Sequence, residues 1–448
     1  MSTITASRWP AVLSWILILS LAGFVVYRNT KSTSNSDTSE LSIDSLRIRV
    51  LAEELIGLKS LSSLVGAGQM EQINQNRAGL LDQLDLFAHS PMDRIHVAIV
   101  VGEISGKDQA MARLEKIGRE PLPSDIEDDI SILRTIYMGG PGDLDAAAKE
   151  RLNQRHDYFA RVALSYGEPS DQEPRHSVEA GALRATMVLG VVALGFLLLL
   201  LASAGFFIAG VVLKLKGRLG RMYVPDALES TAFLEGFALY FVLFILGFGL
   251  LRRFLKLQSL QWEWLAFLIF PLFLAWLSWR GVTREKQRMG LGWHRGKGVM
   301  REIGAGFAGY LAGIVVMAAG IAITYFLVKR TGLSPEHPLI NMLQGNRWHI
   351  LGLYALVVIF APVMEETMFR GALFHHLRRR WGWAVSAPIV AFIFAIIHPQ
   401  GWVAVPALGS IALVLAALRE WRGSLIAPMV AHACNNFIVL TLALALLR

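Results

Sequence analysis

The chain has 448 residues, of which 54% are hydrophobic and 17% charged, against roughly 25% charged residues in soluble domains, which excludes an ordinary soluble globular enzyme. The net charge of +8 is unevenly divided: residues 28–183 hold 17 basic and 25 acidic residues, a net of −8, and the rest holds 26 basic and 10 acidic residues, a net of +16. This basic surplus lies in short clusters between long apolar segments, which indicates charge at a membrane surface and argues against a nucleic-acid partner.

Nine segments are apolar enough to cross a bilayer, which takes about 20 mostly apolar residues in a helix. They are residues 9–27, 185–213, 231–251, 262–279, 303–328, 348–369, 383–398, 403–418 and 424–447. The sequence therefore predicts an all-α, polytopic membrane helix bundle of about eight or nine transmembrane helices. Residues 1–27 are interpreted as a retained N-terminal membrane anchor, because no A-x-A-like cleavage site precedes Arg28.

Basic clusters predict the orientation of the bundle. Alternating the nine segments from a cytoplasmic N-terminus puts three of these clusters inside, namely residues 214–221, 280–301 and 378–380, together with Arg419 and Arg422. Arg252, Arg253 and Lys256 fall outside and count against this arrangement. The sequence thus predicts an integral membrane protein with residues 28–183 extracytoplasmic.

Residues 28–183 form an inserted domain of a different kind. A polar linker, NTKSTSNSDTSE, leads into apolar residues at helical spacing, which predicts a small extramembrane helical domain. It contains no catalytic constellation and is interpreted as a spacer or as a module that binds a protein partner. Two further parts follow, additional transmembrane helices over residues 184–284 and a core over residues 285–448.

Three successive apolar segments near the C-terminus carry polar side chains. Ionisable residues inside a membrane span are costly and are therefore candidates for function. The first segment carries Glu365, Glu366 and Arg370, the second Phe394 and His398, and the third His432, Asn435 and Asn436. By contrast, His375 and His376 lie beside the arginine cluster and are predicted to be solvated.

Helical geometry suggests roles for these residues. Glu366 and Arg370 are four apart and can form an ion pair on one helix face. Glu365 points about 100° away, lacks such a local partner and is a candidate general base. His432 and Asn436 are also four apart and form a candidate oxyanion-binding pair.

His398 allows two interpretations, in which it either holds a water molecule against Glu365 or binds a metal. Glu365, His398 and His432 could supply a three-ligand zinc site with an open position. We favour a mechanism without a cofactor, because an asparagine such as Asn436 is a poor zinc ligand and a good oxyanion donor.

The ordered motifs Glu365-Glu366-x-x-x-Arg370, Phe394-x-x-x-His398 and His432-x-x-x-Asn436 resemble those of the CPBP family of intramembrane proteases, the CAAX-processing and bacteriocin-processing group. The resemblance covers roughly residues 285–447. It implies an intramembrane endopeptidase acting on membrane-associated, prenylated or leader-type protein substrates within membrane lipid.

The family's roles, carried over by motif position, give Glu365 as the base that activates water with His398. His432 and Asn436 would stabilise the oxyanion, with Glu366 and Arg370 as supporting residues. Family members have often been described as metalloproteases, although the same residues also support a metal-free glutamate mechanism. The inserted domain is an addition to the family pattern.

Two other classes of protein also place charges inside a membrane. A transporter or channel would show repeated halves and broken helices, whereas here the polar residues lie in one third of the chain. A non-catalytic scaffold or immunity-type factor that binds a partner through its outer domain remains the alternative hypothesis, and it would tolerate the loss of Glu365.

Overall fold

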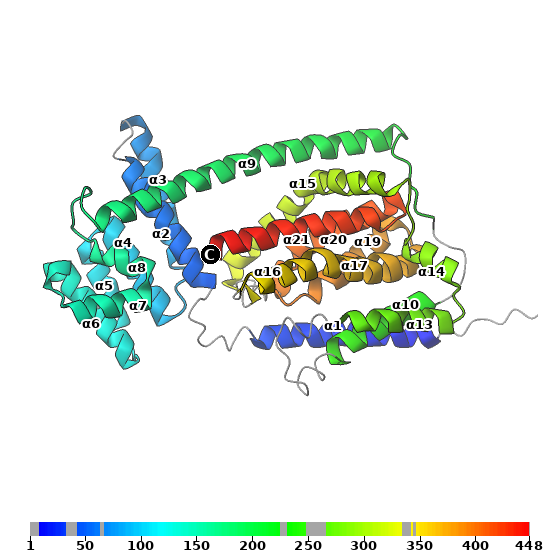
Figure 1. Ribbon diagram of the computed structural model, residues 1–448, viewed down its shortest axis with the longest axis horizontal. Helices are drawn as coiled ribbons and strands as arrows, with labels where there is room; N and C mark the ends of the chain where they lie inside the picture. The colour runs from blue at the N-terminus through cyan, green and yellow to red at the C-terminus, as the bar shows by residue number, and fades with distance from the viewer. Residues whose placement is uncertain are drawn as a thin grey trace, which may run out of the picture. The chain divides into compact units, whose positions relative to one another are not determined.

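A computed structural model describes residues 9–32, 43–62, 67–224, 231–247, 266–333, 342–343 and 346–447 (Figure 1). Every regular element in these ranges is a helix, which confirms the all-α prediction. The chain divides into two compact units, Met1–Ser36 with Leu198–Arg448, and Asp37–Leu197. Most of the predicted polar linker, and the outer basic residues Arg252, Arg253 and Lys256, lie outside the described ranges.

Six described helices are long and apolar enough to cross a membrane, so the chain is an integral membrane protein. They are α1 (Trp9–Ser32), α9 (Arg175–Leu215), α15 (Val299–Thr331), a composite helix over Arg347–Arg378, α20 (Val405–Arg422) with the turn before it, and α21 (Ile426–Leu447). Three shorter apolar helices fall in the other predicted segments: α10 (Ala232–Val242) with the π-helical turn η2 (Leu243–Gly247), α13 (Ile269–Trp279) and α19 (Trp383–Ile396). All nine predicted segments therefore contain an apolar helix, and six of these reach the length of a full crossing.

The smaller unit is built from seven helices and the first part of α9. These helices are α2 (Ile43–Ser62), α3 (Ala67–Leu84), α4 (Pro91–Ser105), α5 (Lys107–Ile117), α6 (Ser124–Gly139), α7 (Ala146–His156) and α8 (Tyr158–Leu164). The start of α4 is fixed by a capping box, in which Ser90 Oγ accepts from the backbone N–H of Asp93 and Asp93 Oδ2 accepts from the backbone N–H of Ser90. The next turns of α4 are buried and form the centre of the core.

A buried ionic cluster ties the end of α4 to its neighbours. Glu103 accepts hydrogen bonds from both terminal nitrogens of Arg175, at 2.6 and 2.7 Å, and from Lys59 Nζ at 2.6 Å. Burial by itself raises the pKa of Glu103, but the hydrogen bonds from Arg175 and the charge of Lys59 outweigh it and hold this pKa below its ordinary value. The first turn of α9 is thereby fixed to α2 and α4, which explains why α9 begins ten residues before the predicted apolar segment.

A second buried polar group joins α4, α6 and α7. His96 Nε2 lies 3.1 Å from His156 Nδ1, and His156 Nε2 lies 3.2 Å from Asp129 Oδ2. The His96 ring also stacks on Phe159 with a centroid distance of 4.0 Å. Burial, together with the neighbouring His156, lowers the pKa of His96 to about 3, so that this ring is neutral at pH 7.

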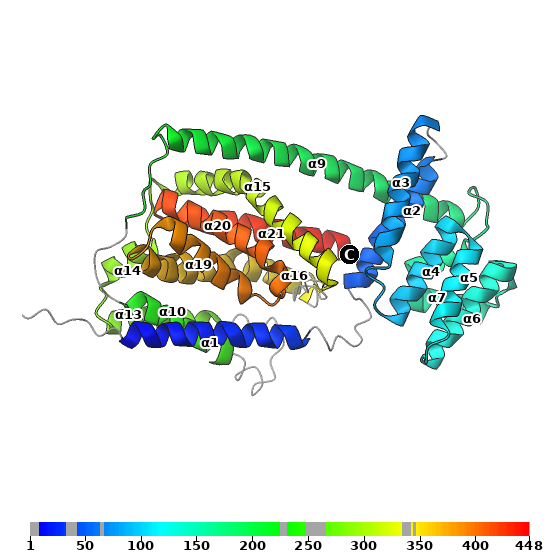
Figure 2. The same ribbon diagram turned by 180° about the vertical axis from the view of Figure 1, so that it is seen from behind.

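Close approach of glycines shapes the membrane unit. On α15, Gly306 meets the backbone of Ala427 in α21, and Gly313 meets Val414 in α20. A Cβ at either glycine would lie under 3 Å from its neighbour, so a larger residue would force the helices apart. Small residues permit such tight helix packing in membranes, where apolar burial alone supplies little attraction. This packing seats α15 against α20 and α21 (Figure 2).

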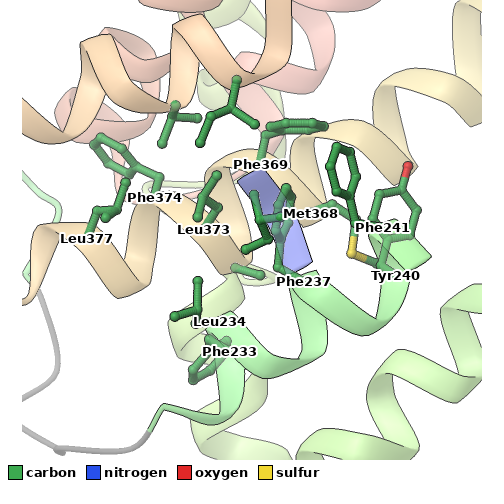
Figure 3. Packing of buried hydrophobic residues seen from close by; sticks show 14 of the residues in the cluster. Phe233, Leu234, Phe237, Tyr240, Phe241, Met368, Phe369, Leu373, Phe374 and Leu377 are labelled. Carbon is green, nitrogen blue, oxygen red and sulfur yellow. The ribbon is translucent and has the colours of Figure 1, made fainter. Parts of the chain in front are cut away.

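An aromatic and aliphatic core lies on the other side of the composite helix (Figure 3). Residues of α10, including Phe233 and Phe237, interleave with Phe369, Phe374 and Leu377 of the composite helix. The Phe237 and Phe369 rings meet edge to face at 5.2 Å, a favoured aromatic geometry. This core fixes the helix that carries the first polar motif.

Arginines and carboxylates meet at one end of the membrane unit, near α14 (Arg284–Leu291) (Figure 1). Arg378 binds Glu420 at 2.8 and 3.0 Å, and Arg422 binds Glu302 at 2.6 and 2.9 Å. The segment after α9 joins them, because the backbone N–H of Tyr223 donates to the carbonyl of Glu420. Basic clusters predicted for one membrane side therefore share one end of the bundle, which we name the basic end.

The prediction that His375 and His376 are solvated is wrong. Their exposed fractions are 2% and 8%. His375 Nδ1 lies 2.8 Å from the Tyr223 hydroxyl, and its ring packs on Phe233 at 4.7 Å. The segment after α9 and helix α10 cover this face. The residues around the histidines do not indicate that these distant segments pack here.

We expect acid to destabilise the smaller unit through His96. An unfolded histidine takes up a proton near pH 6.5, whereas folded His96 does so only near pH 3. Between these two pH values the folded state binds fewer protons than the unfolded state, so the free energy of unfolding falls as the pH falls. Between pH 7 and pH 5 the loss is about 2 kcal/mol. Limited proteolysis of the full-length protein in detergent at each pH measures it.

His96→Gln should remove this part of the pH dependence, and His89→Gln, at an exposed position, should retain it. An equal acid sensitivity in both variants would contradict the assignment to His96.

Candidate active site

The first motif lies on the composite helix, which changes its winding along its length. It runs through α16 (Arg347–Tyr354), the π-helical segment η5 (Ala355–Phe360), α17 (Ala361–Glu366), the π-helical segment η6 (Thr367–Leu373) and α18 (Phe374–Arg378). π-Helical turns are rare and often occur at functional sites. Glu365 and Glu366 close α17, and Arg370 follows in η6.

The predicted ion pair between Glu366 and Arg370 is present. Arg370 Nη1 donates to Glu366 Oε1 at 2.8 Å, and both side chains have an exposed fraction of 0%. Arg370 Nη2 also donates to the carbonyl of Ala412 in α20 at 3.1 Å. Each charge is thus compensated where solvation is poor.

His432 of α21 joins the third motif to the first. Its Nδ1 lies 2.8 Å from Glu366 Oε1, and its Nε2 lies 3.8 Å from Glu365 Oε2. Because Arg370 keeps Glu366 in its acceptor form, His432 carries a proton on Nδ1 and turns Nε2 toward Glu365. The ring therefore stands between two carboxylates with different surroundings.

The two carboxylates differ in access. The side chain of Glu366 is fully buried, whereas that of Glu365 is 26% exposed. Within the described residues, the Oε2 atom of each carboxylate is buried without a hydrogen-bond partner, so it is the exposure of the side chain as a whole that distinguishes Glu365. Of the two carboxylates, Glu365 is the one that a reactant can approach.

His398 follows the end of α19. Its Nδ1 lies 2.5 Å from the carbonyl oxygen of Phe394. Since a carbonyl only accepts, the proton lies on Nδ1, and Nε2 is the acceptor nitrogen of the ring. The Phe394 ring lies 4.4 Å from this ring and 6.0 Å from the His432 ring, which brings the second motif close to the third.

Phe394 lies among the three motifs. Its ring centroid is 4.8 Å from the Arg370 guanidinium carbon, 4.4 Å from the His398 ring and 6.0 Å from the His432 ring. A cation facing an aromatic ring is attracted by its quadrupole. Sequence reasoning recorded Phe394 as a motif position without giving it a role. The structure gives it one, since the ring packs against Arg370 and lies close to both histidines.

Asn436 contacts the composite helix one turn along α21 from His432. Its Nδ2 donates to the carbonyl of Val357 in η5 at 2.9 Å. Val357 precedes Pro362 by five residues, the spacing of a π-helical hydrogen bond, and proline has no N–H to donate. Asn436 thus supplies the hydrogen-bond donor that the Val357 carbonyl lacks within its own helix. His432 and Asn436 both face the composite helix, as their spacing predicted. Only one of the two N–H bonds of the Asn436 amide serves this contact.

The three residues considered for zinc do not form a ligand set in the described part of the chain. No group of three or more His, Cys, Asp or Glu side chains there is arranged to hold a metal ion. The Nδ1 atoms of His432 and His398 are engaged by Glu366 and by a backbone carbonyl. Zinc-bound histidines also make such contacts, which leave Nε2 of each ring open. The mechanism without a metal therefore stays a prediction.

Arg419 is a supporting residue that the sequence analysis assigned to a cytoplasmic cluster. Its exposed fraction is 0%. Its Nε donates to the carbonyl of Arg370 at 3.3 Å, its Nη2 donates to the carbonyl of Gly290 at 2.9 Å, and its cation faces the Tyr223 ring at 4.8 Å. It therefore holds the backbone of the first motif. A single basic residue at a helix end gives no sign of this role.

One comparison with known proteins covers the segment that carries this site. A family model described as "Type II CAAX prenyl endopeptidase Rce1-like" matches residues 347–438, which contain all three motifs. The motifs predict membership in the CPBP family of membrane proteases, and this match supports that prediction. The matched segment begins at the first residue of α16 and ends within α21.

A protein of Escherichia coli, named "Uncharacterized 24.3 kDa protein", is 26% identical over 129 residues. The alignment covers 27% of this chain and 59% of that protein, so the chain spans less than two thirds of the relative's length. No solved structure matches the chain.

Breaking the buried ion pair should destabilise the membrane unit strongly. Arg370→Met leaves the Glu366 carboxylate buried without its cation, which typically costs about 3–5 kcal/mol. Residues 28–183 contain no tryptophan, so thermal unfolding followed by tryptophan fluorescence in detergent reports on the membrane unit. Arg301→Met, which removes an exposed cation of α15, is the control and should unfold as the wild type does.

The double variant Glu366→Leu with Arg370→Met removes both charges and should recover part of the loss. An Arg370→Met protein with wild-type unfolding would show that the pair does not stabilise the bundle.

Proposed function

We propose that this protein is an intramembrane endopeptidase that hydrolyses peptide bonds of membrane-associated proteins with a water molecule activated by Glu365. One observation carries the proposal. The rings of His398, which follows α19, and of His432 of α21 both lie close to Phe394, and Glu365 of α17 lies 3.8 Å from His432 Nε2, with the Glu366–Arg370 pair on the other nitrogen of that ring. Such a convergence of titratable groups on an otherwise apolar bundle is typical of a catalytic site.

The chemistry follows from the two carboxylates. Glu365 accepts a proton from water, and the resulting hydroxide attacks the substrate carbonyl to form a tetrahedral oxyanion. The proton held by Glu365 then passes to the leaving nitrogen as the carbon–nitrogen bond breaks. His398, whose acceptor nitrogen is Nε2, orients the water.

The oxyanion is stabilised by donors from α21. Glu366 accepts from His432 Nδ1 and so orients the ring, which can donate from both nitrogens when both carry a proton. In that form Nε2–H, on the Glu365 side, donates to the oxyanion. The second N–H of Asn436 is the other donor. Glu366 and Arg370 act through His432 and are positioning residues.

The substrates we propose are prenylated C-terminal tails, leader peptides or other membrane-associated proteins, in keeping with the description of the matching family. The basic end would face the cytoplasm of a bacterium, with residues 28–183 on the outer side of the plasma membrane, where they would bind a protein partner. The positive-inside rule supports this orientation.

We expect Glu365→Gln, His398→Ala and His432→Ala to abolish cleavage by the purified protein of a panel of prenylated and leader-type reporter peptides. Asn436→Ala should leave weak turnover, because one oxyanion donor is typically worth about 10²- to 10³-fold in rate. Asn435→Ala is the matched control: among the described residues its amide makes one hydrogen bond, from Nδ2 to Asn436 Oδ1 at a long 3.4 Å, and activity should be close to wild type. Full activity of Glu365→Gln would exclude this mechanism.

The same substitution separates a protease from a non-catalytic scaffold. A scaffold would keep its cellular function in Glu365→Gln as long as the variant folds, which size-exclusion chromatography checks. A protease would lose that function.

Chelators give an independent test of the mechanism without a metal. Because the described residues contain no ready-made cluster of three metal ligands, we expect 1,10-phenanthroline and EDTA to leave the rate of cleavage unchanged. If chelators abolished the activity and zinc restored it, Glu365, His398 and His432 would have to rearrange into a ligand set, and the proposed role of Glu365 would be wrong.

A further inference from the structure

A cavity of about 680 Å³ opens at the basic end of the membrane unit. Arg288 of α14 and Arg295 of the connection to α15 give it a cationic wall, and Val363 of α17 with Ile426 and Met429 at the start of α21 give it an apolar wall. Glu365 and His398 do not line it, so it is separate from the candidate active site.

Arg288 and Arg295 are exposed and lack the carboxylate partner that three other arginines at this end have. Arg280, Arg378 and Arg422 each bind a carboxylate, whereas the guanidinium groups of Arg288 and Arg295 have no ion-pair or hydrogen-bond partner among the described residues. None of the residues that line the cavity is acidic. Two uncompensated cations on one wall, together with the positive N-terminal end of α21 nearby, favour an anionic ligand.

The rest of the cavity suits a ligand with a hydrocarbon part. Val363, Ile426 and Met429 offer it an apolar wall on two membrane-spanning helices. Trp293 lies between the two walls, with its ring stacked on Phe270 at 5.1 Å and its Nε1 donating to Thr367 Oγ1 at 3.0 Å. Tryptophans held in this way are typical of the membrane–water interface. A small soluble anion would make no use of the apolar wall.

We propose that this cavity binds an anionic phospholipid from the leaflet at the basic end. The phosphodiester lies between Arg288 and Arg295, and the first part of an acyl chain lies along Val363, Ile426 and Met429. Basic pockets between membrane helices are known to hold anionic headgroups. Through Val363 and the Trp293–Thr367 hydrogen bond, the bound lipid would brace the composite helix near Glu365.

The test uses delipidated full-length protein in a neutral detergent, with bound lipid counted by native mass spectrometry during titration with phosphatidylglycerol or phosphatidylcholine. We expect selective binding of phosphatidylglycerol, weakened about tenfold or more in Arg288→Gln with Arg295→Gln. The matched control, Arg284→Gln with Arg301→Gln, removes the same charge from exposed positions that do not line the cavity and should bind as the wild type does.

A second variant tests the apolar wall without a change of charge. Ile426→Trp fills the cavity and should also weaken binding of phosphatidylglycerol, with a wild-type elution profile in size-exclusion chromatography showing that the protein folds. Glu365→Gln should bind the lipid normally, so this test is independent of proteolysis.

Several results would overturn the proposal. If both double variants lost affinity for phosphatidylglycerol equally, the attraction would be a diffuse electrostatic one. If the wild type bound phosphatidylcholine as tightly as phosphatidylglycerol, the headgroup would not be recognised. Competition by inorganic phosphate at the same concentration as the lipid would identify a soluble anion as the ligand. Unchanged lipid binding combined with weaker cleavage in Arg288→Gln with Arg295→Gln would assign the cavity to the peptide substrate.

Discussion

The ion pair between Glu366 and Arg370 is the interaction on which the membrane unit depends. A single charge at this depth would be costly, but here each charge has a close partner, and each also bonds to another helix. Glu366 accepts from His432 of α21, and Arg370 donates to the carbonyl of Ala412 in α20. The pair therefore neutralises itself and holds three helices in register around the site.

Two adjacent carboxylates acquire different properties from this arrangement. Glu366 is bound to Arg370 and orients the His432 ring. Glu365 points about 100° away around the helix. Its side chain is partly exposed and lies 3.8 Å from Nε2 of the same ring. The proposed division of labour between a positioning and a reacting carboxylate rests on this difference in environment, as in other sites where neighbouring acids have separate roles.

Arginines at the basic end have two roles. Arg378 and Arg422 bind carboxylates and fasten the ends of helices to one another, and Arg419 does the same through backbone carbonyls. Arg288 and Arg295 lack such partners and line the cavity at the membrane surface. Positive charge on this side therefore both closes the bundle and leaves a place where an anion can be bound.

The sequence by itself determined whatever depends on local spacing. The apolar segments, the pairing of Glu366 with Arg370 and the common face of His432 and Asn436 follow from the helical repeat and from the cost of charge in lipid. Tertiary structure decided the contacts between distant parts of the chain: the burial of His375 under Tyr223, the hold of Arg419 on the backbone of Arg370, and the place of Phe394 among the three motifs. These depend on how helices pack, and the periodicity of a single helix carries no information about which neighbour will cover it.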